Sequence, residues 1–171
     1  IHRIQEAVQA LPWVHQVYIS RRWPDKLVMR VAEQVPLANW QENGLVNNEG
    51  EIFRPENRDE KIKLQLYGAD DEVLKVVAFY QQINAQVLER NMTISSFGRD
   101  LHRDWIVEFD DGLRITMGRD NAAQKLTMFL TVLPSIAASG KRAKTVDLRY
   151  EQGFSVRWAD VSEEVKNDGA A

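Results

Sequence analysis

The sequence predicts an α+β protein in which a few helices and many short strands share one chain. Apolar residues recur with helical spacing in three segments and alternate in most of the other apolar segments, and turn-forming residues separate these segments. At 171 residues the chain is long enough for one large or two small domains. Its apolar content of 44% is sufficient for a folded core.

Composition excludes several classes of protein. A formal net charge of -3 argues against nucleic acid as a partner, because nucleic-acid binders carry basic surfaces. The absence of cysteine excludes disulfides and thiolate metal sites. The longest apolar run, Val76 to Tyr80, is far shorter than a membrane-spanning helix. The chain opens at Ile1 without an initiator Met or a leader, so we expect a fragment whose targeting segment or anchor lies upstream.

The first elements along the chain are a helix and a hairpin. Apolar residues from Arg3 to Leu11 have helical spacing, and Pro12 should end the helix. Strands are expected over Val14 to Ser20 and Leu27 to Val35, and the apolar residues of the second alternate. The turn-forming residues Trp23-Pro24-Asp25 should connect these two strands as a hairpin.

Shorter strands and a charged connector follow. Leu37 to Trp40 and Gly44 to Phe53 are apolar stretches interrupted by residues typical of turns, which predicts short strands. Pro55 to Lys63 is rich in charges of both signs and is expected to be a solvated connector. Leu64 to Tyr67 should form the next strand.

Two further helices and five strands complete the prediction. After Asp70-Asp71-Glu72, one helical face carries seven apolar residues: Val73, Val76, Val77, Tyr80, Ile83, Val87 and Leu88. Helical spacing returns over Asn121 to Ala138 and ends at Ser139-Gly140-Lys141. The expected strands are Thr93 to Phe97, Trp105 to Phe109, Leu113 to Met117, Val146 to Tyr150 and Phe154 to Trp158. From Asp160 onward the composition is polar and is typical of a frayed tail.

The sequence carries only weak signals of catalytic or metal-binding residues. His2, His15 and His102 lie on three different predicted elements without metal-ligand spacing, so no metal or other cofactor is expected. Asp110-Asp111 precedes Gly112 between two strands and is better explained as a hairpin turn than as a catalytic pair. Asp70-Asp71-Glu72 is better explained by the preference for acids at a helix start than as a cation site. The hydrolase, P-loop and dinucleotide signatures are all absent.

The aromatic residues near the end of the chain suggest a different role. Tyr150, Phe154 and Trp158 fall on the last two predicted strands, which suggests the edge of a sheet. A free edge can accept an extended segment of another protein, and aromatic side chains can anchor that segment. Periodicity alone favours the alternative that all three are ordinary core residues.

Several motifs resemble the FtsQ/DivIB family of cell-division proteins over nearly the whole chain. Leu11-Pro12-Trp13-Val14 and Arg22-Trp23-Pro24-Asp25 look like that family's POTRA module. Two further segments resemble the family's connection from POTRA to the next domain: Val35 to Trp40 and Val46 to Gly50. The motifs that match the β domain are Leu66-Tyr67-Gly68, Gly118-Arg119 and, most specifically, Val146-Asp147-Leu148-Arg149-Tyr150.

This resemblance implies a domain organisation and a location. We expect a POTRA domain over residues 1–55 whose first strand lies upstream, a larger mixed or antiparallel β domain with two packed helices over 56–160, and a tail over 161–171. The resemblance implies a single-pass inner-membrane protein of the division septum, with this portion in the periplasm. The membrane helix would precede Ile1.

The resemblance also implies partners. In the family the β domain binds FtsB, which arrives with FtsL, by strand addition, whereas POTRA docks other division proteins. Carried over by position, the partner-binding residues are Arg149, Tyr150, Gly153, Phe154, Val156, Trp158, His102, Arg103 and Ile136. The expected function is a non-enzymatic scaffold of the division machinery. Two alternatives stay open: a POTRA-bearing component of outer-membrane assembly or secretion, and a periplasmic enzyme that uses Asp110 or Asp147.

Overall fold

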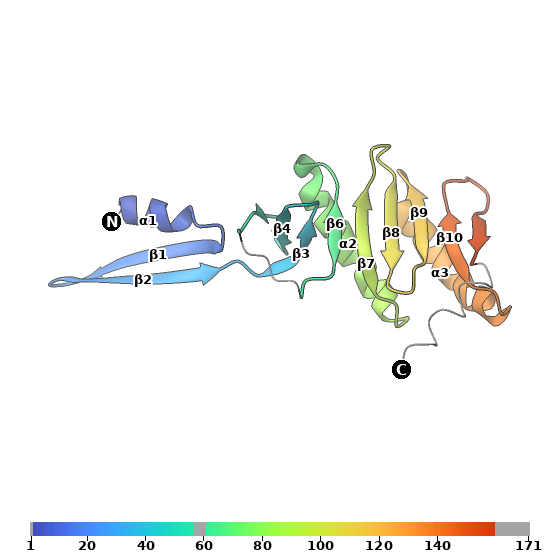
Figure 1. Ribbon diagram of the computed structural model, residues 1–171, viewed down its shortest axis with the longest axis horizontal. Coiled ribbons are helices and arrows are strands. Elements are labelled where there is room, and N and C mark those ends of the chain that lie inside the picture. The colour runs from blue at the N-terminus through green and yellow to red at the C-terminus, as the bar shows by residue number, and fades with distance from the viewer. Residues whose placement is uncertain (1, 57–60, 160–171) are drawn as a thin grey trace. The chain divides into compact units, whose positions relative to one another are not determined.

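The computed structural model describes residues 2–56 and 61–159 and divides the chain into two compact units, Ile1–Leu66 and Tyr67–Ala171 (Figure 1). The described residues form three α-helices and eleven strands, which confirms the α+β class. Part of the predicted connector, residues 57–60, and the whole predicted tail, residues 161–171, lie outside the described residues. Within the described part, no helix is long and apolar enough to cross a membrane.

The first unit opens with the predicted helix and hairpin. Helix α1 spans His2–Gln9, and strands β1 (Val14–Arg22) and β2 (Lys26–Glu33) pair antiparallel. The connecting turn contains a cis peptide bond between Trp23 and Pro24. The helix and both strands therefore lie, within two residues at most ends, where the spacing of apolar residues predicted them.

Burial in this hairpin is smaller than the alternating pattern suggests. Val17 on β1 is 3% exposed, but Leu27, Met29 and Val31 on β2 are 42–52% exposed. Alternation identified the strand because it reports which residues share a face. It does not report whether that face is covered.

The rest of the first unit consists of short paired strands. Strand β3 (Pro36–Trp40) pairs antiparallel with β4 (Gly44–Asn47), which pairs antiparallel with β5 (Ile52–Phe53). On its other edge β3 pairs parallel with β6 (Gln65–Tyr67). The fully buried residues of these strands are Ala38, Trp40, Leu45, Val46 and Leu66.

A buried asparagine ties the hairpin to these strands. Asn47 is 2% exposed, and its Nδ2 donates to Oε1 of Gln34 and Oε2 of Glu51, both at 2.8 Å. Its Oδ1 accepts the backbone amides of Glu49 and Glu51. Nδ1 of His15 lies 2.9 Å from the same Glu51 oxygen. The hydrogen bond from Asn47 is the main reason why the pKa of Glu51 is lowered.

The second unit is built on a mixed sheet with strand order β11-β10-β9-β8-β7. Its strands are β7 (Ile94–Arg99), β8 (Trp105–Phe109), β9 (Arg114–Gly118), β10 (Ala143–Asp147) and β11 (Ser155–Trp158). All neighbours in this order are antiparallel except β9 and β10, which run parallel. A parallel pair needs a long crossover, and helix α3 (Ala122–Ala138) supplies it.

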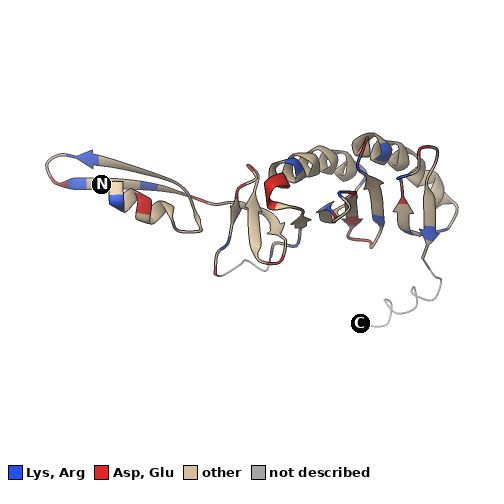
Figure 2. Ribbon diagram, turned by 90° about the horizontal axis from the view of Figure 1, so that it is seen from above, with Lys and Arg blue, Asp and Glu red and all other residues tan. Residues whose placement is uncertain are grey.

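Two helices cover one face of this sheet (Figure 2). A 3-10 turn, η1 (Asp70–Glu72), leads into α2 (Val73–Leu88), which packs on β7, while α3 packs on β9. Six of the seven residues predicted for the inner face of α2 are buried. Leu88 is the exception, at 53% exposed, because it lies in the last turn at the margin of the apolar stripe.

Aromatic side chains fill the core beneath α2. Phe97 stacks on Trp105 with ring centroids 5.4 Å apart, and Phe79 meets both rings edge-on. Next to Phe97, Gly98 passes so close to the chain at Tyr67 that an added Cβ would lie 2.1 Å from the Tyr67 carbonyl oxygen. Glycine is therefore required at this position by close approach of backbone.

Candidate partner-binding site

Strand β11 lies at the edge of the sheet (Figure 1). It pairs with β10, with Val156 opposite Val146 and Trp158 opposite Ala143. Among the described residues, no strand lies along its other side. An unpaired edge presents free backbone N–H and C=O groups, which is the property that strand addition requires.

The two aromatic residues of this strand region are partly exposed. Phe154, just before β11, is 39% exposed and meets Phe129 of α3 edge-on, with ring centroids 5.3 Å apart. Trp158 is also 39% exposed, and Nζ of Lys141 lies 5.4 Å from the centroid of its ring. Neither is an ordinary core residue, so the alternative that periodicity favoured is wrong for both.

Tyr150 is not on a strand, which corrects the sequence prediction. Strand β10 ends at Asp147, whose Oδ1 accepts the backbone amide of Arg149 at 3.0 Å. An Asp side chain that bonds the backbone two residues later forms a local turn in competition with the strand ladder. Tyr150 consequently lies in the loop between β10 and β11, where it is 57% exposed.

The same loop contributes to a hollow of about 190 Å³ against α3. Gly153 in this loop has φ +98°, and a Cβ there would meet no atom within 4 Å. The loop and α3 together line the hollow with Lys125, Met128, Phe129, Val132, Leu148, Tyr150, Glu151, Gly153 and Phe154. The hollow is large enough for one apolar side chain and is bounded by Phe154, the residue just before β11.

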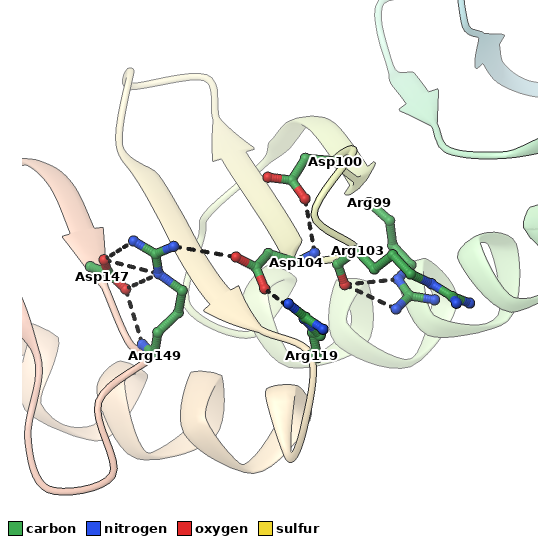
Figure 3. Close-up of polar contacts among 7 residues, drawn as sticks. All are labelled: Arg99, Asp100, Arg103, Asp104, Arg119, Asp147 and Arg149. Atoms are coloured by element: carbon green, nitrogen blue, oxygen red, sulfur yellow. Dashed lines mark hydrogen bonds and ion pairs between the residues drawn. The ribbon is translucent and has the colours of Figure 1, made fainter.

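Arg149 is held in place by two carboxylates (Figure 3). Its Nε and Nη2 donate to the Asp147 carboxylate, the latter at 2.6 Å, and its Nη1 lies 3.4 Å from Oδ2 of Asp104. These hydrogen bonds from Arg149 lower the pKa of Asp147. The other oxygen of Asp104 lies 3.8 Å from Nε of Arg119. Since the Arg149 side chain remains 54% exposed, an oriented guanidinium faces solvent.

Arg103 belongs to a neighbouring ion pair. It has φ +64° in the turn between β7 and β8, and its Nη2 donates to Oε1 of Glu72 at 2.7 Å. Arg99 donates to the same oxygen at the same distance. The pKa of Glu72 is lowered, with the hydrogen bond from Arg103 as its largest cause. Glu72 is thus the centre of an ion-pair cluster. The prediction explained this acidic segment by the start of the helix, but Glu72 forms no side-chain capping hydrogen bond there and pairs with arginines instead.

Two predicted site residues stand apart from the rest. His102 is exposed in the same turn as Arg103, and no described contact links it to β11. Ile136 is partly buried near the end of α3 and lines a different pocket from the hollow at Tyr150. The structure therefore groups the loop and β11 residues but leaves His102 and Ile136 outside that group.

Sequence reasoning missed several residues that build the site. Asp104 pairs with Arg149, and Arg119 pairs with Asp104. Asp104 comes from a loop and Arg119 follows β9, so only the tertiary fold brings them together. Met128 and Val132 are exposed on α3 at i and i+4. Two apolar residues at that spacing, outside the apolar stripe of the helix, are visible in the sequence and could have indicated an exposed apolar contact surface.

Two of the carboxylates considered for catalysis, Asp111 and Asp147, make structural hydrogen bonds. Asp111 Oδ1 accepts the Leu113 amide in the turn where Gly112 has φ +85°, which confirms the hairpin interpretation. Asp147 is engaged by Arg149, and its lowered pKa is opposite to the change that a general acid needs. Within residues 2–56 and 61–159, no three His, Cys, Asp or Glu side chains gather as a metal site.

Comparisons with known proteins identify the family. The sequence matches the profile of "Cell division protein FtsQ/DivIB, C-terminal" over residues 38–149 and that of "POTRA domain, FtsQ-type" over residues 1–34. It is 33% identical to cell division protein FtsQ of Shewanella oneidensis over 96% of this chain and 64% of that protein. Identity to FtsQ of Escherichia coli K12 is 29%, over 91% of this chain and 59% of that protein.

A third relative extends the same result. FtsQ of Thioalkalivibrio is 33% identical over 97% of this chain and 69% of its own length. The chain spans 64% and 59% of the Shewanella and Escherichia proteins, so its relatives contain further sequence. The family profiles cover both parts of the chain, and they confirm the resemblance and the POTRA-type N-terminus. The chain belongs to the FtsQ/DivIB family of cell-division proteins.

Proposed function

We propose that this chain is the periplasmic part of a non-enzymatic division scaffold that binds an FtsB-type protein, arriving with an FtsL-type protein, at the free edge of β11. Under this proposal residues 1–55 form a POTRA domain that docks other division proteins, and residues 56–160 form the partner-binding β domain. A single helix upstream would anchor the protein in the inner membrane at the septum. The observation that carries the proposal is the unpaired edge of β11 beside exposed aromatic side chains.

The backbone of β11 has the polarity that a partner strand needs. The amide of Ala159 donates to the Arg142 carbonyl on the β10 side. Backbone groups in a strand alternate in direction, so Arg157 should also face β10, whereas Val156 and Trp158 present their N–H and C=O groups to the free side. A partner strand can then form hydrogen bonds with those two residues, which supports strand addition as the mode of binding.

Side chains around the edge of β11 can anchor a partner strand and fix its alignment with β11. The hollow beside Tyr150 can take one apolar side chain of the partner, and burial of such a side chain contributes about 1.5–3 kcal/mol. Arg149 and Arg103 expose 54% and 62% of their side chains, so both can meet acidic partner residues. Such exposed charges mainly set the association rate and the alignment of the two strands.

Calorimetric titration of the purified chain with the periplasmic segment of an FtsB-type protein tests the proposal. Tyr150→Glu should abolish the heat of binding, because a charge would enter an apolar contact. Tyr18→Glu is the matched control, since Tyr18 on β1 is 58% exposed, compared with 57% for Tyr150. Circular dichroism should show that both variants are folded. Binding by a folded Tyr150→Glu variant with unchanged affinity would refute this site.

A further inference from the structure

A second and larger pocket lies where α2 and α3 end. It has a volume of about 490 Å³ and is separate from the hollow beside Tyr150, because it is lined by other residues of α3. Its apolar wall includes Leu130, Leu133 and Pro134 of α3, together with Met92. The volume lies in the range of ligand pockets and exceeds what one side chain fills.

The rim of this pocket is positively charged. Arg90, Lys141 and Arg142 line it, and Asp111 is the only acidic lining residue among the residues that the structure describes. Arg90 donates to the backbone carbonyl of Gln86 at 2.7 Å, Arg142 donates to the backbone carbonyl of Asp111, and Lys141 lies over the ring of Trp158. Within the described residues, none of these three cations forms an ion pair with a carboxylate. Their charges are therefore available to an anionic ligand.

The wall also lacks one of its helical hydrogen bonds. Pro134 has no amide hydrogen, so the Leu130 carbonyl has lost the donor that residue i+4 normally provides in a helix. Both residues line the pocket. Leu130 is only 1% exposed, so this carbonyl is enclosed, and a ligand would meet the apolar side chains of the wall and the cations of the rim.

We propose that this pocket is a second docking site, which takes an acidic segment of a protein partner and buries two or more of its apolar side chains. Carboxylates of the segment would meet Arg90 and the Lys141–Arg142 pair, while Leu- or Phe-like side chains would fill the apolar wall. A concave pocket of about 490 Å³ suits protruding side chains of a polypeptide better than a flat anionic membrane surface. This site goes beyond the strand-addition function and does not depend on it.

Fluorescence anisotropy with a labelled acidic peptide built from Leu, Phe and Glu tests the site. The peptide should bind the 171-residue chain at low salt, and its analogue with Lys in place of Glu should not. Arg90→Glu should weaken binding by about tenfold, because an attraction becomes a repulsion. Ala137→Trp, which puts a large ring into the pocket, should remove binding. Arg30→Glu on β2 is the matched charge control and should bind normally.

Further measurements distinguish this site from the hollow beside Tyr150, from a membrane-binding site and from a site for the chain's own C-terminal residues. Tyr150→Glu should bind the acidic peptide normally, because it alters only the hollow beside β11. Failure of any acidic peptide to bind, or equal binding by Ala137→Trp, overturns the proposal. Binding of anionic phospholipid vesicles that Arg90→Glu abolishes would assign the pocket to a membrane and overturn it. If the peptide binds a chain that ends at Ala159 but not the full chain, the natural occupant of the pocket would be the chain's own residues 160–171, which include Asp160, Glu163 and Glu164. That result would overturn the proposal of a separate protein partner.

Discussion

Replacing one amide on the free edge of β11 separates strand addition from side-chain docking. Val156→Pro removes the backbone N–H of Val156, which we infer to face away from β10. Proline is tolerated on an edge strand when the lost N–H faces solvent, so pairing with β10 should survive. The variant should therefore remain folded and lose a donor that only a partner would use.

The size of the effect follows from the length of the strand. Only Val156 and Trp158 present groups to the free side, so a partner strand can form at most about four backbone hydrogen bonds here, worth about 0.5–1.5 kcal/mol each. Val156→Pro removes one of them, leaves a partner carbonyl without a donor and places a ring at the contact. The expected loss is about 1–3 kcal/mol, or about 5–150-fold in Kd.

The assay is titration calorimetry with the periplasmic segment of an FtsB-type protein. Val156→Thr keeps the amide and a β-branched side chain, so it should bind within about twofold of the original chain. Thermal unfolding and circular dichroism establish that both variants are folded. If folded Val156→Pro binds as tightly as Val156→Thr, then β11 does not pair with the partner through its backbone, and the orientation inferred from Ala159 is refuted.

Two further predictions concern the scaffold that supports the site. Gly98→Ala should lower the free energy of unfolding by about 3 kcal/mol or more, because its Cβ would lie 2.1 Å from the Tyr67 carbonyl oxygen; chemical denaturation measures this, and an unchanged midpoint would contradict the close approach. When the pH is lowered from 5 to about 3, the free energy of unfolding should fall less steeply for Asp147→Asn than for the original chain. The pKa of Asp147 is lowered by Arg149, so its contribution is complete above about pH 4 and is lost as pH falls through the folded-state value. Melting curves across this range that run parallel for the two proteins would show that the Asp147–Arg149 pair does not stabilise the fold.

Much of the fold could be predicted because it depends on local patterns. Six of seven residues assigned to the inner face of α2 are buried, since helical spacing identifies which residues share a face. Turn residues such as Gly112 located the hairpin between β8 and β9. Exposure of Leu27 and Leu88 was not predictable in the same way, because it depends on what covers a face.

The candidate site was predicted less completely for a comparable reason. Tyr150 was assigned to a strand because it continues the alternation of Val146 and Leu148, and that pattern does not include the competing hydrogen bond at Asp147. The hollow beside Tyr150 depends on Met128 and Val132 of α3, which approach the loop only through the crossover from β9 to β10. The spacing of apolar residues along the chain does not reveal contacts between segments that are far apart in sequence.

The sequence by itself determined the α+β class, the order of the helices and strands, and the family, because these depend on residue spacing and on motifs such as Val146 to Tyr150. Only the tertiary structure decided which strand is left at the edge, which carboxylates orient Arg149, and where two separate hollows open beside α3. The physical reason is range: spacing and turn chemistry act over a few residues, whereas an edge, an ion-pair cluster and a pocket join segments that are far apart in the chain.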